Sequence, residues 1–147
     1  MPEFVASVVI DAPVERVFAF HERPDALELL TPKFPPVRVT RKSGGIQTGA
    51  QVDLRIGPIR WLAQHTAFER NQLFVDEQLQ GPFAQWVHRH EFENLGKQTR
   101  LTDRVQYKLK GGAPVNAAFR RVVESMLRRM FAHRHRVTKE WNEGAGG

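Results

Sequence analysis

The chain of 147 residues contains no cysteine. That absence excludes a disulfide scaffold, thiolate metal sites and cysteine nucleophiles, and it is typical of proteins in a reducing compartment. Long hydrophobic runs are missing too, since the longest apolar stretch near the N-terminus is the few residues around Val8–Ile10. Neither a secretory leader nor a membrane span fits so short a run, so we expect a soluble protein of the cytoplasm.

Two common catalytic motifs are also absent. Gly44-Gly45 and Gly111-Gly112 lack the Lys-Ser/Thr of a phosphate-binding loop and are typical of turns, and no serine lies in a nucleophile-elbow context. The chain does have 41% hydrophobic residues, including ten Phe and three Trp, which is enough for the core of one globular domain. We expect this domain at residues 1–143 and a flexible tail at 144–147.

Positive charge is concentrated near the C-terminus. Residues 115–141 hold seven basic and two acidic side chains and therefore carry five of the six net positive charges. A basic helix there could meet nucleic acid, an acidic partner or anionic lipid. Because Phe131 is the only helix aromatic predicted to lie outside the interior, base stacking has little support, and no specific nucleic acid is expected.

The order of hydrophobic patterns predicts one strand, two short helices, six strands and a long helix. The first strand covers residues 4–10, one helix covers 12–21, and a second begins at Pro24 and ends before Pro32. Period-two patterns separated by Gly, Pro and Asn turns then predict six antiparallel strands, at residues 37–42, 50–56, 59–69, 73–80, 84–93 and 98–110.

The last helix is predicted to follow Gly111–Pro114 and to run for about 27 residues, or roughly 40 Å. Its exposed face is predicted to carry Arg121, Arg128, Arg136 and Lys139. His135 is predicted to point nearly directly away from the sheet. His133 falls in the middle of the apolar stripe that is predicted to face the sheet, which consists of Val115, Phe119, Val122, Met126, Met130, Val137 and Trp141. Val123 and Leu127 widen this stripe on one side.

Three segments resemble a known superfamily. Residues 10–32 read IDAPVERVFAFHERPDALELLTP, residues 74–92 read FVDEQLQGPFAQWVHRHEF, and residues 99–109 read TRLTDRVQYKL. They resemble the polyketide cyclase/dehydrase-like branch of the START-like (SRPBCC) superfamily. The resemblance implies an α+β helix-grip fold, in which a curved seven-stranded antiparallel sheet wraps around a long C-terminal helix and two short helices follow the first strand. The superfamily holds binders, transporters, cyclases and hydrolases, so it implies no single chemistry.

Alternation on two neighbouring strands brings histidines and an aspartate to one inner face. Trp86, His88, His90 and Phe92 share the more apolar face of their strand, and Asp103 lies on the inner face of the next. A turn at 94–97 would place Asp103 opposite His88, and a turn at 95–98 would place it opposite His90, at a Cβ separation of about 5 Å. In either register we expect Asp103 within hydrogen-bonding reach of one of them, directly or through one water.

Further polar side chains are predicted inside. The alternation Trp61, Ala63, His65, Ala67 leaves space between large side chains, and the resemblance favours inward positions for Asp76 and Gln78. Three interpretations stay open for the interior polar group: a hydrogen-bond network without ligand, the polar end of a ligand pocket, or a catalytic or metal site, since an H-x-H pair near an aspartate can hold zinc. The group consists of His65, Asp76, Gln78, His88, His90, Asp103 and His133.

Our hypothesis is that a small, apolar or amphipathic molecule binds in the cavity between sheet and helix, without cofactor or metal, in a monomer or homodimer. The alternative is a cyclase, dehydratase or isomerase that uses Asp103 with His88 or His90, and a third is an interaction module that uses the basic helix. Besides the polar group, the expected lining residues are Trp61, Phe74, Trp86, Phe92, Leu101, Val105, Tyr107, Met126 and Met130.

Overall fold

The computed structural model describes residues 2–33 and 36–144, and within them it contains seven strands and three helices. Their order and type are those predicted, and most boundaries agree within two residues. In chain order they are β1 (Glu3–Ile10), α1 (Val14–His21), α2 (Ala26–Leu30), β2 (Val37–Ser43), β3 (Gln51–Ile56), β4 (Ile59–Glu69), β5 (Leu73–Gln80), β6 (Phe83–Asn94), β7 (Thr99–Leu109) and α3 (Gly112–Glu143).

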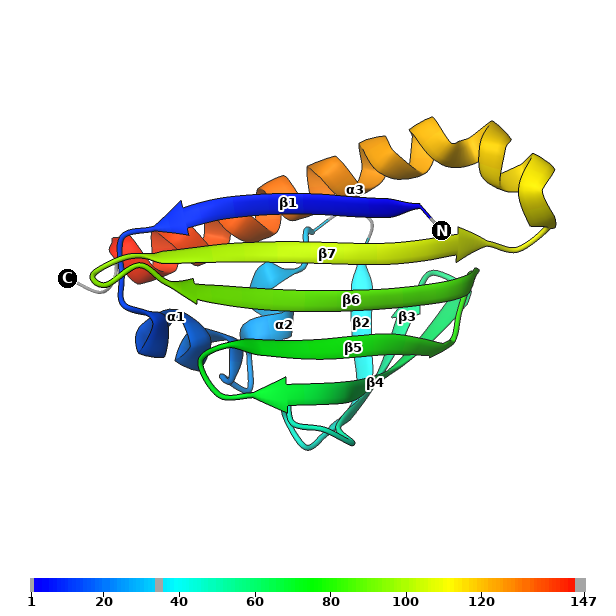
Figure 1. Ribbon diagram of the computed structural model, residues 1–147. Coiled ribbons are helices and arrows are strands. Elements are labelled where there is room, and N and C mark those ends of the chain that lie inside the picture. The colour runs from blue at the N-terminus through cyan, green and yellow to red at the C-terminus, as the bar shows by residue number, and fades with distance from the viewer. Residues whose placement is uncertain (1, 34–35, 145–147) are drawn as a thin grey trace.

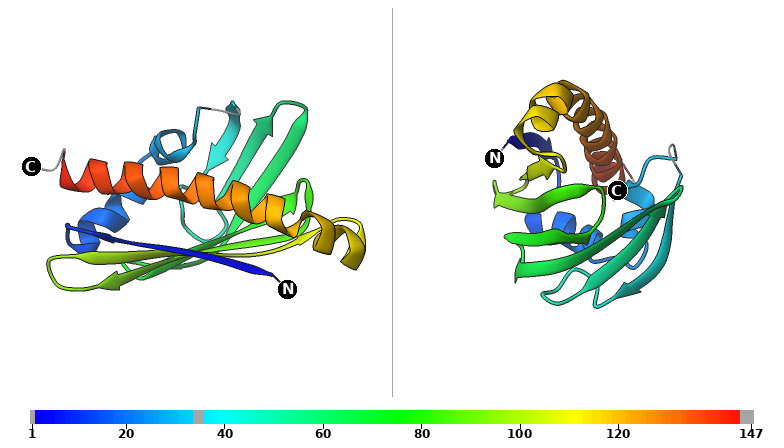
Figure 2. Two further views of the ribbon diagram at one scale, coloured as in Figure 1. Left: turned by 90° about the horizontal axis from the view of Figure 1, so that it is seen from above. Right: turned by 90° about the vertical axis from the view of Figure 1, so that its right-hand side faces the viewer.

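The strands form one antiparallel sheet in the order β1-β7-β6-β5-β4-β3-β2 (Figure 1). Apart from β1, each strand pairs with its neighbour in the chain, so the sheet is a series of hairpins closed at one edge by β1. The sheet curls, and α3 lies across its open side while α1 and α2 lie near one end (Figure 2). The predicted helix-grip fold is confirmed.

The β6–β7 hairpin sets the register on which the interior depends. Asn94 pairs with Thr99, so the turn covers residues 95–98. Gly96 has φ of 90°, a left-handed conformation that favours glycine, and its N–H donates to Oδ1 of Asn94 at 2.8 Å. This turn places His90 directly opposite Asp103, one of the two predicted registers.

Two hydrophobic clusters lie on the inner face of the sheet. One is built where α1 packs on the strand ends and contains Ile10, Val14, Val17, Phe18, Phe74, Phe92 and Leu101. The other lies beneath α3 and contains Phe83, Trp86, Val105, Tyr107, Val123, Leu127 and Phe131. Buried His88, His90 and Asp103 come from the strand positions between these clusters, so polar groups divide the core in two.

The start of α3 is tied to the end of β7. Gly111 and Gly112 have φ of 105° and 78° and turn the chain, and the Asn116 side chain accepts from the N–H of Leu109 at 2.8 Å and donates to its carbonyl at 3.1 Å. The helix has 32 residues, more than predicted. Gly144 still donates to the carbonyl of Glu140, and residues 145–147 of the expected tail lie outside the described residues. In the described part of the chain, no helix is both long and apolar enough to span a membrane.

The predicted centre of the inward face of α3 was wrong, whereas Val123 and Leu127, predicted at one side of the apolar stripe, are buried. Phe119, Val122 and Met126 are 52%, 64% and 53% exposed, and Trp141 is also exposed. The hydropathy pattern did not locate the buried face because half of its side chains are polar, and these form hydrogen bonds within the fold. The residues that α3 buries are Val123, Leu127, Phe131, His135, Thr138 and Asn142, at helical spacings of three or four.

This rotation of the helix can be tested with two neighbouring valines. Val123→Ala is expected to lower the free energy of unfolding by about 2 kcal/mol, because it removes two methyl groups from beneath α3 and leaves a cavity. Val122→Ala, the matched control on the exposed face, should change it by less than about 0.5 kcal/mol. Urea unfolding monitored by circular dichroism measures both. The reverse order of effects would restore the predicted face.

Candidate functional site

The candidate site is a group of buried polar side chains from five elements, lying between the two hydrophobic clusters. It is called the interior polar cluster below and consists of His65 (β4), Asp76 (β5), His88 and His90 (β6), Asp103 (β7) and His135 (α3). All but Asp76 are at least nine-tenths buried, and the Asp76 side chain is 18% exposed. Strand alternation brings the first five to one face, and the helix closes over them with the sixth.

Asp103 is the centre of the interior polar cluster. The Nε2–H of His88 donates to its Oδ1 at 2.7 Å, and the Nε2–H of His135 donates to its Oδ2 at 2.6 Å. Nδ1 of His90 lies 3.2 Å from the same Oδ1. The predicted contact between Asp103 and a β6 histidine is confirmed, and both histidines make it.

The two carboxylates of the cluster are held in the ionised form. Burial disfavours the charge of Asp103, but hydrogen bonds from three histidines outweigh it, so the pKa of this carboxyl lies well below its usual value. Burial opposes the charge of Asp76 as well, and its hydrogen bond from Nε2 of His90, at 2.9 Å, and the nearby imidazoles again set its pKa well below the usual value. The site therefore carries two buried negative charges.

His88 and His90 stack on each other, yet their pKa values are shifted in opposite directions. Their ring centroids are 3.7 Å apart, and His90 also stacks on Phe74 at 3.9 Å. Burial lowers the pKa of His90, but its hydrogen bonds to Asp103 and Asp76 outweigh burial and raise it. For His88, burial and the charge of His90 outweigh its bond to Asp103, and its pKa is lowered. The surroundings therefore favour the imidazolium form of His90 and the neutral form of His88.

The sequence did not predict His135 in the cluster. It predicted His133 there instead, and this prediction was wrong. His133 is half-buried, and its Nδ1 lies 3.2 Å from a guanidinium nitrogen of Arg136. Phe131, predicted to lie off the apolar stripe, is fully buried and packs against His88 at 5.1 Å. The spacing Leu127, Phe131, His135 was a usable signal, since i and i+4 side chains share one helix face.

The expected apolar lining is largely inside. Trp61 is partly buried and meets Trp86 edge-on, with ring centroids 5.0 Å apart. Met130 packs partly buried against the cluster beneath α3, whereas Met126 is exposed, so its expected inward position is corrected. The remaining predicted lining residues are all buried: Phe74, Trp86, Phe92, Leu101, Val105 and Tyr107.

Two buried polar atoms in the described part of the chain have no hydrogen-bond partner: Nδ1 of His65 and the hydroxyl of Tyr107. Gln78, by contrast, is satisfied, because its side chain bonds both backbone groups of Phe83 and so holds the β5–β6 turn. It lies outside the interior polar cluster. An unpaired buried polar atom costs about 1–3 kcal/mol, so each of the two is a place where a bound molecule could form a hydrogen bond.

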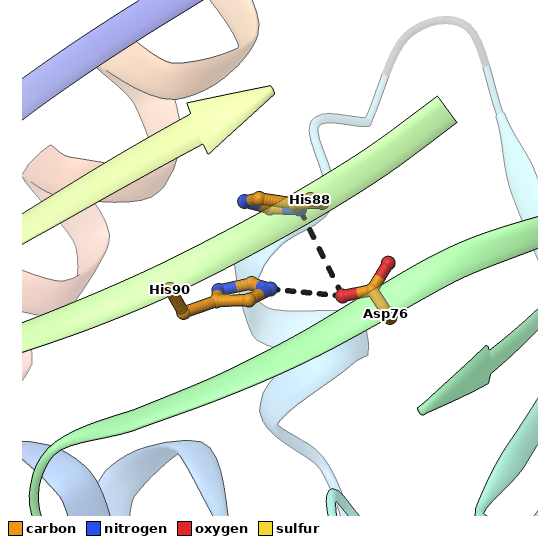
Figure 3. Close-up of side chains that lie close together, drawn as sticks. All are labelled: Asp76, His88 and His90. Atoms are coloured by element: carbon orange, nitrogen blue, oxygen red, sulfur yellow. Dashed lines mark hydrogen bonds and ion pairs between the residues drawn. The ribbon is translucent and has the colours of Figure 1, made fainter. Parts of the chain in front are cut away.

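One subset of the interior polar cluster has the spacing of metal ligands. One ligand atom each from Asp76, His88 and His90 lies within 4.8 Å of the others (Figure 3). The imidazole and carboxylate groups are the donors that zinc and related ions take in proteins. The sequence had left a metal site open as one of three interpretations, although the preferred hypothesis had no metal.

The exposed basic face of α3 agrees with prediction. Arg121, Arg128, Arg136 and Lys139 are all exposed, and Lys139 pairs with Glu143 at 2.6 Å. No described residue of the interior polar cluster belongs to this face.

Comparison with known proteins identifies a family and several solved structures with a similar fold. The family model described as polyketide cyclase / dehydrase and lipid transport matches residues 10–136. No curated protein matches the chain. Among solved structures, the protein TTHA0849 from Thermus thermophilus is 19% identical, with a TM-score of 0.75 over 99% of this chain and 100% of its own. The Zhui aromatase/cyclase from Streptomyces sp. R1128 is 12% identical, with a TM-score of 0.74 over 99% and 98%.

A third similar structure is larger. The nucleoside-diphosphate sugar epimerase from Corynebacterium glutamicum is 26% identical, with a TM-score of 0.76, and the match covers 93% of this chain but only 28% of the epimerase. The likeness is therefore to one part of that protein.

Proposed function

Because the chain belongs to the polyketide cyclase/dehydrase and lipid transport family, whose members imply a ligand-binding cavity, we propose that it binds a small, largely apolar molecule between the sheet and α3. The observation that carries this proposal is the pair of unpartnered buried atoms, Nδ1 of His65 and the hydroxyl of Tyr107. Folded interiors rarely leave such atoms unpaired, and a ligand with one or two polar groups would satisfy them.

The surroundings of Tyr107 support an apolar ligand with a polar end. Tyr107 pairs across the strands with Trp86, which in turn meets Trp61 and Phe83. Aromatic walls beside one fixed hydroxyl are typical of pockets that bind a ring and orient its substituent. The first experiment is native mass spectrometry of gently purified protein, in which we expect a bound molecule.

Tyr107→Phe separates the role of the hydroxyl from that of the ring. With 2-naphthol as probe and tryptophan fluorescence as readout, the variant is expected to bind about 5–10-fold more weakly, the effect of one hydrogen bond. Naphthalene, which lacks the hydroxyl group, is the matched control and should bind both proteins equally. Without ligand the variant should be as stable as the wild type, or up to about 1–2 kcal/mol more stable, because an unpaired buried group is gone.

Failure of both probes to bind saturably would contradict the proposed function. Equal weakening of both probes would mean that Tyr107 only shapes the wall.

Acid–base catalysis in the same cavity is the second function that one observation favours. Asp103 joins the imidazoles of His88 and His135 at 2.7 and 2.6 Å, a buried chain of proton donors and acceptors. A cyclase, dehydratase or isomerase would use such a chain. Deuterium exchange into an enolisable β-diketone, abolished in His88→Gln, would place catalysis ahead of binding alone.

A further inference from the structure

Three side chains of the interior polar cluster bring possible metal-ligand atoms close together. Oδ2 of Asp76 lies 2.9 Å from Nε2 of His90 and 3.9 Å from Nδ1 of His88 (Figure 3). A tetrahedral zinc ion, with bonds of about 2.0–2.2 Å, keeps its ligand atoms roughly 3.3 Å apart, a value between these two distances. We propose that Asp76, His88 and His90 form a binding site for one divalent first-row transition metal ion of the zinc type.

The outer partners of the two histidines support this assignment. A metal-bound histidine usually donates its other ring N–H to a carboxylate, which fixes the ring and its tautomer. Here Nε2 of His88 and Nδ1 of His90, the nitrogens directed away from Asp76, lie 2.7 and 3.2 Å from the same oxygen of Asp103. Asp103 is itself held by His135 through its other oxygen. Both rings are thus positioned to present their remaining nitrogens to an ion, which would displace the proton between Nε2 of His90 and Asp76.

The charge and donor types select the class of ion. The cluster holds the buried carboxylate of Asp103 and the partly buried carboxylate of Asp76, and a dication beside them would balance both charges. Two imidazole nitrogens and one carboxylate oxygen suit zinc, cobalt or iron, whereas calcium and magnesium prefer all-oxygen sites. The Asp76 side chain is 18% exposed, which gives an ion a path from solvent.

His65 lies next to Asp76 and provides a further observation beside the site. It pairs with Asp76 across β4 and β5, is 6% exposed, and its Nδ1 has no hydrogen-bond partner. Three protein ligands leave a fourth position on a tetrahedral ion, which water usually fills. This inference goes beyond the binding of an apolar molecule and does not depend on it.

Equilibrium dialysis of chelator-stripped protein against ZnCl2, with elemental analysis, tests the proposal. We expect one zinc ion per chain. Asp76→Asn and His88→Gln should each weaken binding by more than the roughly 10–100-fold that loss of an outer partner costs. His133→Gln, which removes a half-buried histidine of α3 outside the cluster, is the matched control and should bind like the wild type.

Absence of stoichiometric zinc binding by the wild type, or loss of binding in His133→Gln alone, would overturn the site. If circular dichroism shows that a ligand variant is unfolded, Co²⁺ added to the wild type decides instead. Visible d–d bands of four-coordinate cobalt that zinc displaces support the site, and a spectrum of hydrated Co²⁺ only would overturn it. Failure of the aromatic probes to bind would leave these metal outcomes unchanged, so the two proposals fail separately.

Discussion

Replacing Asp103 with asparagine is expected to lower the free energy of unfolding by about 3–5 kcal/mol, the usual effect of removing one partner from a buried ion pair. The carboxylate accepts on both oxygens, from His88 at 2.7 Å and from His135 at 2.6 Å. Asparagine offers one acceptor and places an NH2 group against the other histidine, and it removes the charge that faces His90. Urea unfolding at pH 7 measures the loss.

Asp25→Asn is the control for a change of the same chemistry at the surface. Asp25 pairs with Arg23 at 2.8 Å, but both side chains are exposed, so the unfolding midpoint should hardly move. A similar, small effect of Asp103→Asn would show that the buried histidines find other partners without the carboxylate. The cluster would then add little to stability and would not be held rigidly in place for a ligand or an ion.

The sheet side of this cluster was predictable from the sequence. A shift of one residue would turn every β6 side chain to the other face, so the apolar Trp86 and Phe92 determine where His88 and His90 point. The sequence narrowed the residue opposite Asp103 only to His88 or His90. The choice depends on a turn at 95–98 in which Gly96 takes a left-handed conformation, and alternation carries no information about that turn.

The helix side was not predictable in the same way. Periodicity locates a buried face by its apolar residues, but His135, Thr138 and Asn142 lie on the buried face of α3 and are satisfied by hydrogen bonds.

A bulge between β4 and β5 also limited what the sequence could predict. The register shifts between His65 and Ala67, after which Phe68 packs on the core, so simple alternation fails beyond His65.

His21 is expected to make the fold sensitive to mild acid. Its ring is buried at the end of α1, and its Nδ1 lies 2.9 Å from the carbonyl of Val17. Burial lowers its pKa to about 4; the Val17 carbonyl and Asp103 oppose this shift, while the charges of His90 and Arg134 add to it. The unfolded chain binds this proton near pH 6.5 and the folded chain only near pH 4, so stability is full above pH 6.5 and falls between the two values.

The expected loss from this one group is about 2 kcal/mol between pH 7 and pH 5, and about 3 kcal/mol by pH 4. His21→Phe keeps a flat ring of similar size beside Phe20 and Phe92 but cannot take up a proton. In urea unfolding with a chelator present, the variant should be no more stable than the wild type at pH 7, and should gain on it by about 2 kcal/mol at pH 5.

Phe20→Leu is the control, since it disturbs the same packing next to His21 without changing a titrating group. It should lower stability by equal amounts at both pH values. The other buried carboxylates and histidines also respond to acid, but they are common to all three proteins, so they cancel in the comparison. A wild-type and a His21→Phe curve that run parallel from pH 7 to pH 5 would show that His21 takes up its proton in the folded chain as readily as in the unfolded one, and acid sensitivity would then originate in the interior polar cluster.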